Sequence, residues 1–111
     1  MSDRLTADFW VAAYLTRLRL HAIPAFVVKR GHEIAGAVLV KLNTLDGQAT
    51  CFQRSFDLSS GERRWVVLAQ GAEATVDASI TKQRSFDPDL WVIEVEDRAG
   101  RHLLDEDGLS T

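Results

Sequence analysis

Apolar and polar positions alternate on both sides of a short turn in the middle of the chain. Residues 35–42 are rich in β-branched and aliphatic side chains and residues 49–56 alternate, so both segments are predicted strands. Asp46-Gly47 lies between them, and a three-residue loop over 45–47 would join them if Gly47 takes a positive φ. The pattern therefore predicts a hairpin over residues 35–57.

The loop also determines which residues of the two strands face each other. One face is mostly apolar and is the predicted core face, with Leu42 opposite Thr50, Val40 opposite Phe52, Val38 opposite Arg54 and Gly36 opposite Phe56. The other face is mixed and suits contact with water, a partner or a thin cover, and it carries Ala37, Leu39 and Lys41 against Ser55, Gln53 and Cys51. A slip of one residue in the turn would exchange the two faces.

A helical periodicity precedes the hairpin. Thr6 is a suitable N-cap, and Pro24 ends the helix because its ring excludes the α conformation from the residue before it. Between them the apolar residues recur at helical spacing: Trp10, Val11, Tyr14, Leu15, Leu18 and Ala22. We expect this apolar stripe to pack on the core face of the sheet.

Three further strands and a second helix complete the pattern. Strands are predicted over residues 25–30, 62–69 and 90–96, and a shorter helix begins after Gly71. This order predicts an α+β fold with a mostly antiparallel five-stranded sheet, in which the first four strands form a meander. We expect both helices on one face, and the fifth strand either beside the fourth or at the far edge beside the first.

Composition and charge limit the classes of function. The 111 residues are enough for a single domain that folds without metals or disulfides, and residues 98–111 form a polar tail. The single cysteine, the absence of a signal core after residues 1–4 and the lack of the ~18 apolar residues of a membrane span predict a cytoplasmic protein. The net charge is −3, so nucleic-acid binding is disfavoured, although a local basic patch is conceivable at Lys29-Arg30 and Arg63-Arg64.

Several charged or reactive residues lie inside the predicted strands. Cys51 faces Lys41 on the predicted register, and a neighbouring ammonium can lower the pKa of a thiol. Because nothing places a histidine beside Cys51 as a base, we favour its interpretation as a small apolar filler in a half-covered strand. Lys41 and Arg54 are expected to snorkel toward solvent or to pair with a carboxylate such as Glu94.

Glu94 and Glu96 fall on one face of the fifth strand, a geometry in which two carboxylates can hold Mg²⁺ or Ca²⁺. With Asp57 or Asp105 nearby, they would suit a metal-assisted hydrolase or nuclease. Acidic strand ends more often protect a sheet edge, and that is the interpretation we favour. The histidines lack metal-ligand spacing, and the sequence contains no phosphate-binding loop or nucleophile elbow.

Six segments between residues 9 and 97 carry a resemblance to a known family, and the resemblance spans nearly the whole chain. They are Phe9-Trp10-Val11, Ile23–Val28, Val40–Asn43, Phe52–Asp57, Arg64–Val67 and Phe86–Asp97. The chain closely resembles a family of short alphaproteobacterial proteins catalogued only as domain of unknown function 1491. The resemblance implies a stand-alone cytoplasmic domain, and it brings no activity, cofactor or catalytic residue with it.

The leading hypothesis is therefore a small non-enzymatic domain that binds a protein partner or a second copy of itself, and no membrane. Its expected binding residues lie on the mixed face of the sheet: Leu39, Lys41, Cys51 and Gln53. No catalytic residue and no cofactor is assigned. The alternative is the metal-assisted hydrolase or nuclease, with Glu94 and Glu96 as its metal ligands. Trp10, Trp65 and Trp91 are expected in the core, and the most exposed of them is the first candidate for an interface anchor.

Overall fold

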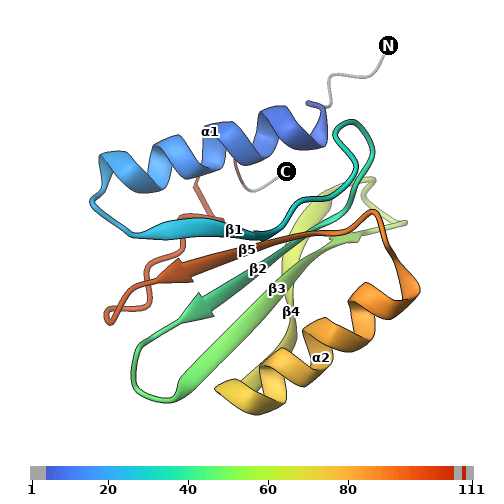
Figure 1. Cartoon of the computed structure of the whole chain (residues 1–111). Helices are drawn as coiled ribbons and strands as arrows, with labels where there is room; N and C mark the ends of the chain where they lie inside the picture. Colours follow the sequence, from blue (N-terminus) through green and yellow to red (C-terminus); the bar gives the residue numbers. More distant parts are fainter. Residues whose placement is uncertain (1–4, 107–108, 110–111) are drawn as a thin grey trace.

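In the computed structural model, which describes residues 5–106 and 109, five strands form one sheet with a helix on each side (Figure 1). The elements are α1 (Ala7–Leu20), β1 (Ala25–Lys29), β2 (Val38–Asn43), β3 (Gln48–Phe56), β4 (Arg63–Ala72), α2 (Glu73–Phe86) and β5 (Trp91–Glu96). The predicted α+β class and the mostly antiparallel sheet are confirmed. Residues 1–4, and residues 107–108 and 110–111 of the predicted tail, lie outside the described residues.

The strands are ordered β1-β5-β2-β3-β4, so β5 lies inside the sheet. It runs antiparallel to β1 and parallel to β2. The predicted meander of four strands is therefore wrong and extends only from β2 to β4. Of the two positions considered for the fifth strand, the place beside the first strand is correct, but β5 lies inside the sheet and not at its edge. A central place suits β5 because Trp91, Val92, Ile93 and Val95 are almost fully buried and require cover on both faces.

The central hairpin has the predicted register beside its turn. Val40 pairs with Phe52, Lys41 with Cys51 and Leu42 with Thr50. Gly47 has the expected positive φ of 86°, and Leu45 also takes a positive φ, of 62°. The alternation of side chains between the two faces therefore follows the prediction.

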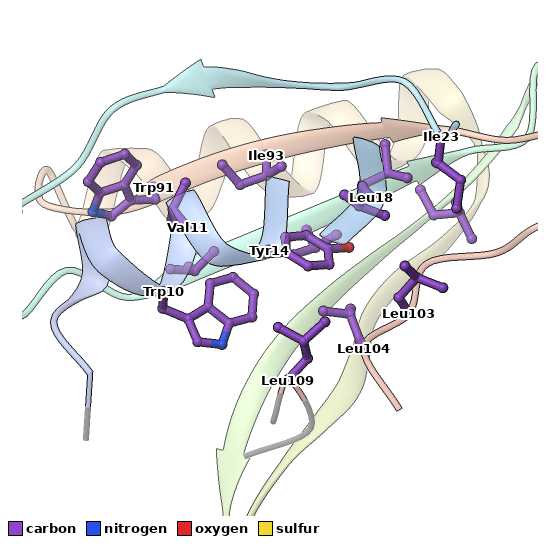
Figure 2. Packing of buried hydrophobic residues seen from close by; sticks show 14 of the residues in the cluster. Trp10, Val11, Tyr14, Leu18, Ile23, Trp91, Ile93, Leu103, Leu104 and Leu109 are labelled. Carbon is purple, nitrogen blue, oxygen red and sulfur yellow. The ribbon is translucent and has the colours of Figure 1, made fainter. Parts of the chain in front are cut away.

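The two helices cover opposite faces of the sheet, so the prediction that they share one face is wrong (Figure 1). On one side α1 packs on Val38, Val40 and Leu42 of β2. On the other side α2 packs on Leu39 and Cys51. All six residues of β2 are buried, because this strand lies between both layers. Figure 2 shows the α1 side, where Trp10, Val11, Tyr14 and Leu18 point toward β5 and the C-terminal segment.

The segment after β5 completes the core on the α1 side. Leu103, Leu104 and Leu109 are buried there (Figure 2). The hydroxyl of Tyr14 donates a hydrogen bond to the carbonyl of His102 at 2.8 Å, and Nε1 of Trp65 donates to the carbonyl of Leu109 at 2.9 Å. Leu103 and Leu104 thus anchor the tail, which is part of the core. Within the described residues, neither helix combines the length and apolar character needed to cross a bilayer.

His102 makes the docking of this segment sensitive to acid. Burial lowers the pKa of His102 below its ordinary value of 6.5, against the opposing charge of Asp105, and its Nδ1 accepts a hydrogen bond from the amide of Leu104 at 3.0 Å. The unfolded chain therefore binds a proton at a higher pH than the folded chain. The stability from neutral His102 is complete above about pH 6.5 and is lost as the pH falls below it. Thermal unfolding measured across this range should show a falling midpoint.

His102→Asn is the matched control, because an asparagine oxygen can accept the same amide hydrogen two residues on and does not titrate. The difference in midpoint between wild type and variant should shrink as the pH falls. A constant difference would show that His102 is not the group responsible.

Candidate functional site

Lys41 lies at the centre of a group of carboxylates beneath α2. Its side chain is only 6% exposed, and its Nζ is 2.7 Å from both Glu73 Oε2 and Asp77 Oδ1 and 3.4 Å from Glu94 Oε1. Glu73 and Asp77 share one face of α2 because they are four residues apart, and Glu94 is the partner of Lys41 in the parallel pair of β2 and β5. The amide of Asn43 donates to both Glu73 and Glu94. The predicted pairing of Lys41 with a carboxylate is confirmed.

The surroundings of Lys41 keep its ammonium charged. Burial, the largest single influence, favours the neutral amine, but hydrogen bonds to Asp77 and Glu73 and the charge of Glu94 together outweigh it. The pKa of Lys41 therefore lies above its ordinary value. A lysine that acts as a base or nucleophile needs the opposite shift, so this geometry makes Lys41 a structural cation.

The same arrangement changes the interpretation of Glu94 and Glu96 as metal ligands. Glu94 is already neutralised by Lys41 and hydrogen-bonded by Asn43. Asp57 is engaged elsewhere, at the β3–β4 turn, where it accepts hydrogen bonds from Ser59. Within residues 5–106 and 109, no group of three histidine, cysteine or acidic side chains is placed to hold a metal ion.

Cys51 is fully buried in the core between α2 and the sheet. Burial raises the pKa of Cys51 to about 12, and the charge of Lys41 opposes this shift only in part. The possibility that Lys41 activates the thiol is therefore wrong. The favoured interpretation of Cys51 as an apolar filler agrees with its place in the core, where Cys51 itself is fully covered.

Three of the four predicted binding residues on the mixed face are buried. Leu39, Lys41 and Cys51 are 3%, 4% and 0% exposed, because α2 covers them. The alternation of Leu39 and Lys41 indicated a solvated face, because two of the carboxylates that pair with Lys41 come from α2, which is distant in the sequence. Gln53 is half-buried. Leu39 and Gln53 nevertheless contribute to a different feature, an open cleft at the end of the hairpin.

This cleft has a volume of about 630 Å³ and lies where β2 and β3 separate. Their pairing ends at Val40 and Phe52, and beyond that point β3 pairs with β4 alone. The predicted pairs of Val38 with Arg54 and of Gly36 with Phe56 do not form. The start of α1, the β1–β2 connection and the last turns of α2 close the remaining sides.

Three large apolar side chains at the cleft remain in contact with solvent. Leu5, Ile34 and Phe56 are 51%, 61% and 50% exposed. Hydrogen bonds from the amides of Ala7 and Asp8 to the carbonyls of Ile34 and Glu33, at 3.0 and 2.9 Å, hold the β1–β2 connection against the first turn of α1. Ile34, one of the three side chains of this apolar rim, is therefore held beside the first turn of α1.

The walls of the cleft add polar groups to this rim. They are Thr6, Gln53, Arg54, Ser55, Arg63, Gln83 and Asp87. The side-chain amides of Gln53 and Gln83 make no hydrogen bond to another residue in the described part of the chain. Arg54 lies over the rings of Trp10 and Trp65, at 4.7 and 4.9 Å from their centroids, so its guanidinium group stacks on both rings.

The tryptophans follow the prediction of a core role. Trp91 and Trp10 are 1% and 4% exposed, and Nε1 of Trp91 donates to the carbonyl of His32 at 2.8 Å. Nε1 of Trp10 is buried with no acceptor among the described residues. Trp65 is the most exposed of the three, but the contacts of its ring and Nε1 within the chain leave it a poor anchor for a partner.

The rim residues Leu5, Ile34 and Phe56 were not predicted as site residues. In the sequence, an apolar residue at the end of an element is interpreted as part of the core.

The architecture defines a small α+β domain with one five-stranded sheet between two helices, and comparison with known proteins places it in a family. The chain belongs to the family described as protein of unknown function (DUF1491), which matches residues 5–105. The predicted resemblance is confirmed. A comparison with curated proteins gave no match.

Solved structures of relatives share both sequence and fold with this chain. A crystal structure of a DUF1491 family protein from Caulobacter crescentus CB15 is 40% identical, covers 93% of this chain and 97% of its own, and has a TM-score of 0.84. An NMR structure of a family protein from the same organism is 40% identical, covers 92% and 94%, and has a TM-score of 0.79. The solution structure of protein Atu0922 from A. tumefaciens is 30% identical, covers 84% and 86%, and has a TM-score of 0.72.

Proposed function

We propose that this chain is a protein-binding domain, and that its partner inserts an apolar side chain into the cleft between Leu5, Ile34 and Phe56. The observation that carries the proposal is the exposure of these three side chains, each at least half accessible, around one cavity of about 630 Å³. Apolar groups gathered around a concavity mark surfaces that bind. The proposal assigns no catalytic residue.

The polar groups of the cleft support a polypeptide as the occupant. A peptide backbone presents donors and acceptors in alternation, and the free amides of Gln53 and Gln83 offer both. Most pockets for ligands have this combination of apolar walls with a few hydrogen-bonding groups. The volume suits one or two large side chains of a partner, while the amides would hold the partner's backbone.

The proposal thus keeps the binding role of the sequence-based hypothesis, but it places the binding site at the cleft and not on the mixed face of the sheet. The mixed face of the sheet is covered by α2, so a partner cannot reach Lys41 or Cys51. Leu39 and Gln53 retain a part in the proposed site because both line the cleft.

Selection of random peptides displayed on phage against the immobilised chain tests this function. We expect enriched peptides to share a large aliphatic or aromatic residue, and amide NMR shifts on titration with one synthetic peptide to cluster at the cleft. Ile34→Glu should lower the affinity for this peptide by about tenfold or more, because it removes an apolar contact worth roughly 1.5–3 kcal/mol.

Leu58→Glu is the matched control. Leu58 is 90% exposed in the β3–β4 turn and does not line the cleft, so the same substitution there should leave the affinity unchanged. Circular dichroism of both variants should match the wild type, since both side chains lie at the surface. Equal losses in the two variants, NMR shifts centred elsewhere or a selection without enrichment would each overturn the proposal.

A further inference from the structure

The outward side of α1 carries an apolar stripe that its packing on the sheet leaves uncovered. Phe9 and Leu20 are 61% and 79% exposed near the two ends of the helix. Ala12, Ala13 and Thr16 lie between them, and together with Arg17 these residues form a shallow hollow of about 320 Å³. The residues that hold α1 on the sheet point the opposite way (Figure 2).

The middle of this stripe suits close contact with another helix. Ala12 and Ala13 are small and exposed. The hydroxyl of Thr16 donates to the carbonyl of Ala12 at 2.9 Å, so its methyl group is left to face outward. Two helices approach to about 8–10 Å where the side chains between them are small. The stripe is therefore narrow at its centre and bulky at its ends.

The order of residues along the stripe is self-complementary. At about 100° per residue, Phe9, Ala13, Thr16 and Leu20 fall within an arc of roughly 60°. If a second copy of α1 lies antiparallel, with the two-fold axis midway between Ala13 and Thr16, Phe9 of one chain faces Leu20 of the other. Ala13 then faces Thr16 of the second copy, so each bulky end meets a bulky end and the small residues meet in the middle.

Charges on one flank of the stripe fit the same arrangement. Asp8 and Arg19 project from the same flank, about 20° apart around the helix axis. In an antiparallel pair related by a two-fold axis, the same flank of each helix lies on the same side of the contact. This places Arg19 of the second copy within about 3 Å of Asp8 along the helix axis. Arg19 makes no ion pair with another described residue. On the opposite flank, Arg17 of one chain would face Arg17 of the second copy. The ion pair of Arg17 with Glu106, at 3.2 Å, reduces the repulsion between these two arginines.

We infer that a second copy of this chain packs antiparallel on α1, with Phe9 against Leu20 at both ends and two ion pairs between Asp8 and Arg19. A helix of this length is about 21 Å long, and one pair of such helices buries less than the 1,200–2,000 Å² of a typical stable complex. The dimer is therefore weak, with a dissociation constant on the order of 10–100 µM. This surface is separate from the cleft, so the inference does not depend on the proposed function.

Analytical ultracentrifugation of the full chain from about 5 µM to about 500 µM tests the inference. We expect a reversible monomer–dimer equilibrium, and Ala13→Glu should raise the dissociation constant by about tenfold or more because it places a charge at the centre of the contact. Ala78→Glu is the matched control, since Ala78 is an exposed alanine on α2. A strict monomer over the whole range, or equal effects of the two substitutions, would overturn the inference.

A charge exchange tests the orientation. Asp8→Arg and Arg19→Asp should each weaken the dimer, because each brings like charges together, and the double variant should recover most of the affinity. Circular dichroism of the monomers checks that α1 remains folded in all three proteins. If the double variant is no tighter than the single ones, Asp8 and Arg19 do not meet and the antiparallel arrangement is wrong.

Discussion

Replacing Lys41 with methionine is expected to lower the free energy of unfolding by about 3 kcal/mol, at the lower end of the range for breaking a buried ion pair. The methionine side chain would still fill the space of the lysine stem, but the three carboxylates around it would lose the ammonium that offsets part of their charge. Glu73 and Asp77 are 39% and 52% exposed and can turn to water, so the main penalty falls on Glu94, which is 15% exposed. Urea unfolding at neutral pH measures this loss.

The dependence on salt gives a second, independent result. The pKa of Lys41 is raised in the folded state, so its stabilising contribution is complete below the ordinary value of 10.5 and does not change between neutral and mildly acidic pH. In the Lys41→Met protein the carboxylates repel one another without the ammonium between them, and added salt screens this repulsion. The variant should therefore recover part of its lost stability, relative to the wild type, as the salt concentration rises at neutral pH.

Asp77→Asn is the control for Lys41→Met. Its half-exposed carboxylate is only one of three neighbours of Lys41, so its loss should cost less than about 1 kcal/mol. If the two substitutions cost the same, the ammonium is not the centre of the cluster and the interpretation of Lys41 as a structural cation is wrong.

Replacing Gly36 with alanine is expected to cost about 3 kcal/mol, because the added methyl group has no room. A Cβ atom at this position would lie 2.5 Å from the carbonyl oxygen of Asp89, 2.7 Å from that of His32 and 2.8 Å from Cδ1 of Trp91. Two of these neighbours are backbone atoms that cannot turn aside, so the β1–β2 connection must move away from the start of β5. The midpoint of urea unfolding measures the cost.

Gly61→Ala is the comparison for Gly36→Ala. Gly61 has a φ of 74° and open space around its Cβ position, so alanine there meets only the strain of a left-handed backbone, roughly 1–2 kcal/mol. The free energy of unfolding lost through steric overlap at Gly36 should exceed the free energy lost through backbone strain at Gly61. A smaller loss at Gly36 would show that the connection yields easily, and the placement of Ile34 at the rim of the proposed binding cleft would then need revision.

Local patterns predicted the parts of this fold that depend on neighbours in sequence. The turn at Asp46-Gly47 sets the register, and the pairs of Val40 with Phe52 and Lys41 with Cys51 follow from it. The place of β5 could not be read in the same way, because strand order depends on contacts between residues far apart in the chain. The continuous apolar run of β5 was the one local sign of a central strand.

The candidate site was harder to predict, for two physical reasons. The alternation of Leu39 and Lys41 resembled an exposed face, since a buried lysine is recognised only once its carboxylates are placed, and Glu73 and Asp77 come from α2. The cleft exists because β2 and β3 separate beyond Val40, whereas hairpin reasoning extends the pairing to Gly36. Leu39 and Gln53 line this cleft, for a reason unrelated to the predicted face, and their role in binding stays a prediction.

The insertion of β5 between β1 and β2 has a consequence for how the protein is made. Among the described residues, β5 is the one strand that pairs with β1, and it joins β1 to the rest of the sheet. A ribosome releases β1 early and β5 late, so a nascent chain can close the β2–β4 meander while β1 waits for its neighbour. Exposed apolar strand edges of this kind invite aggregation, and closing such long-range pairs is slow. The interval before β5 emerges is therefore the period in which the growing chain most needs a chaperone.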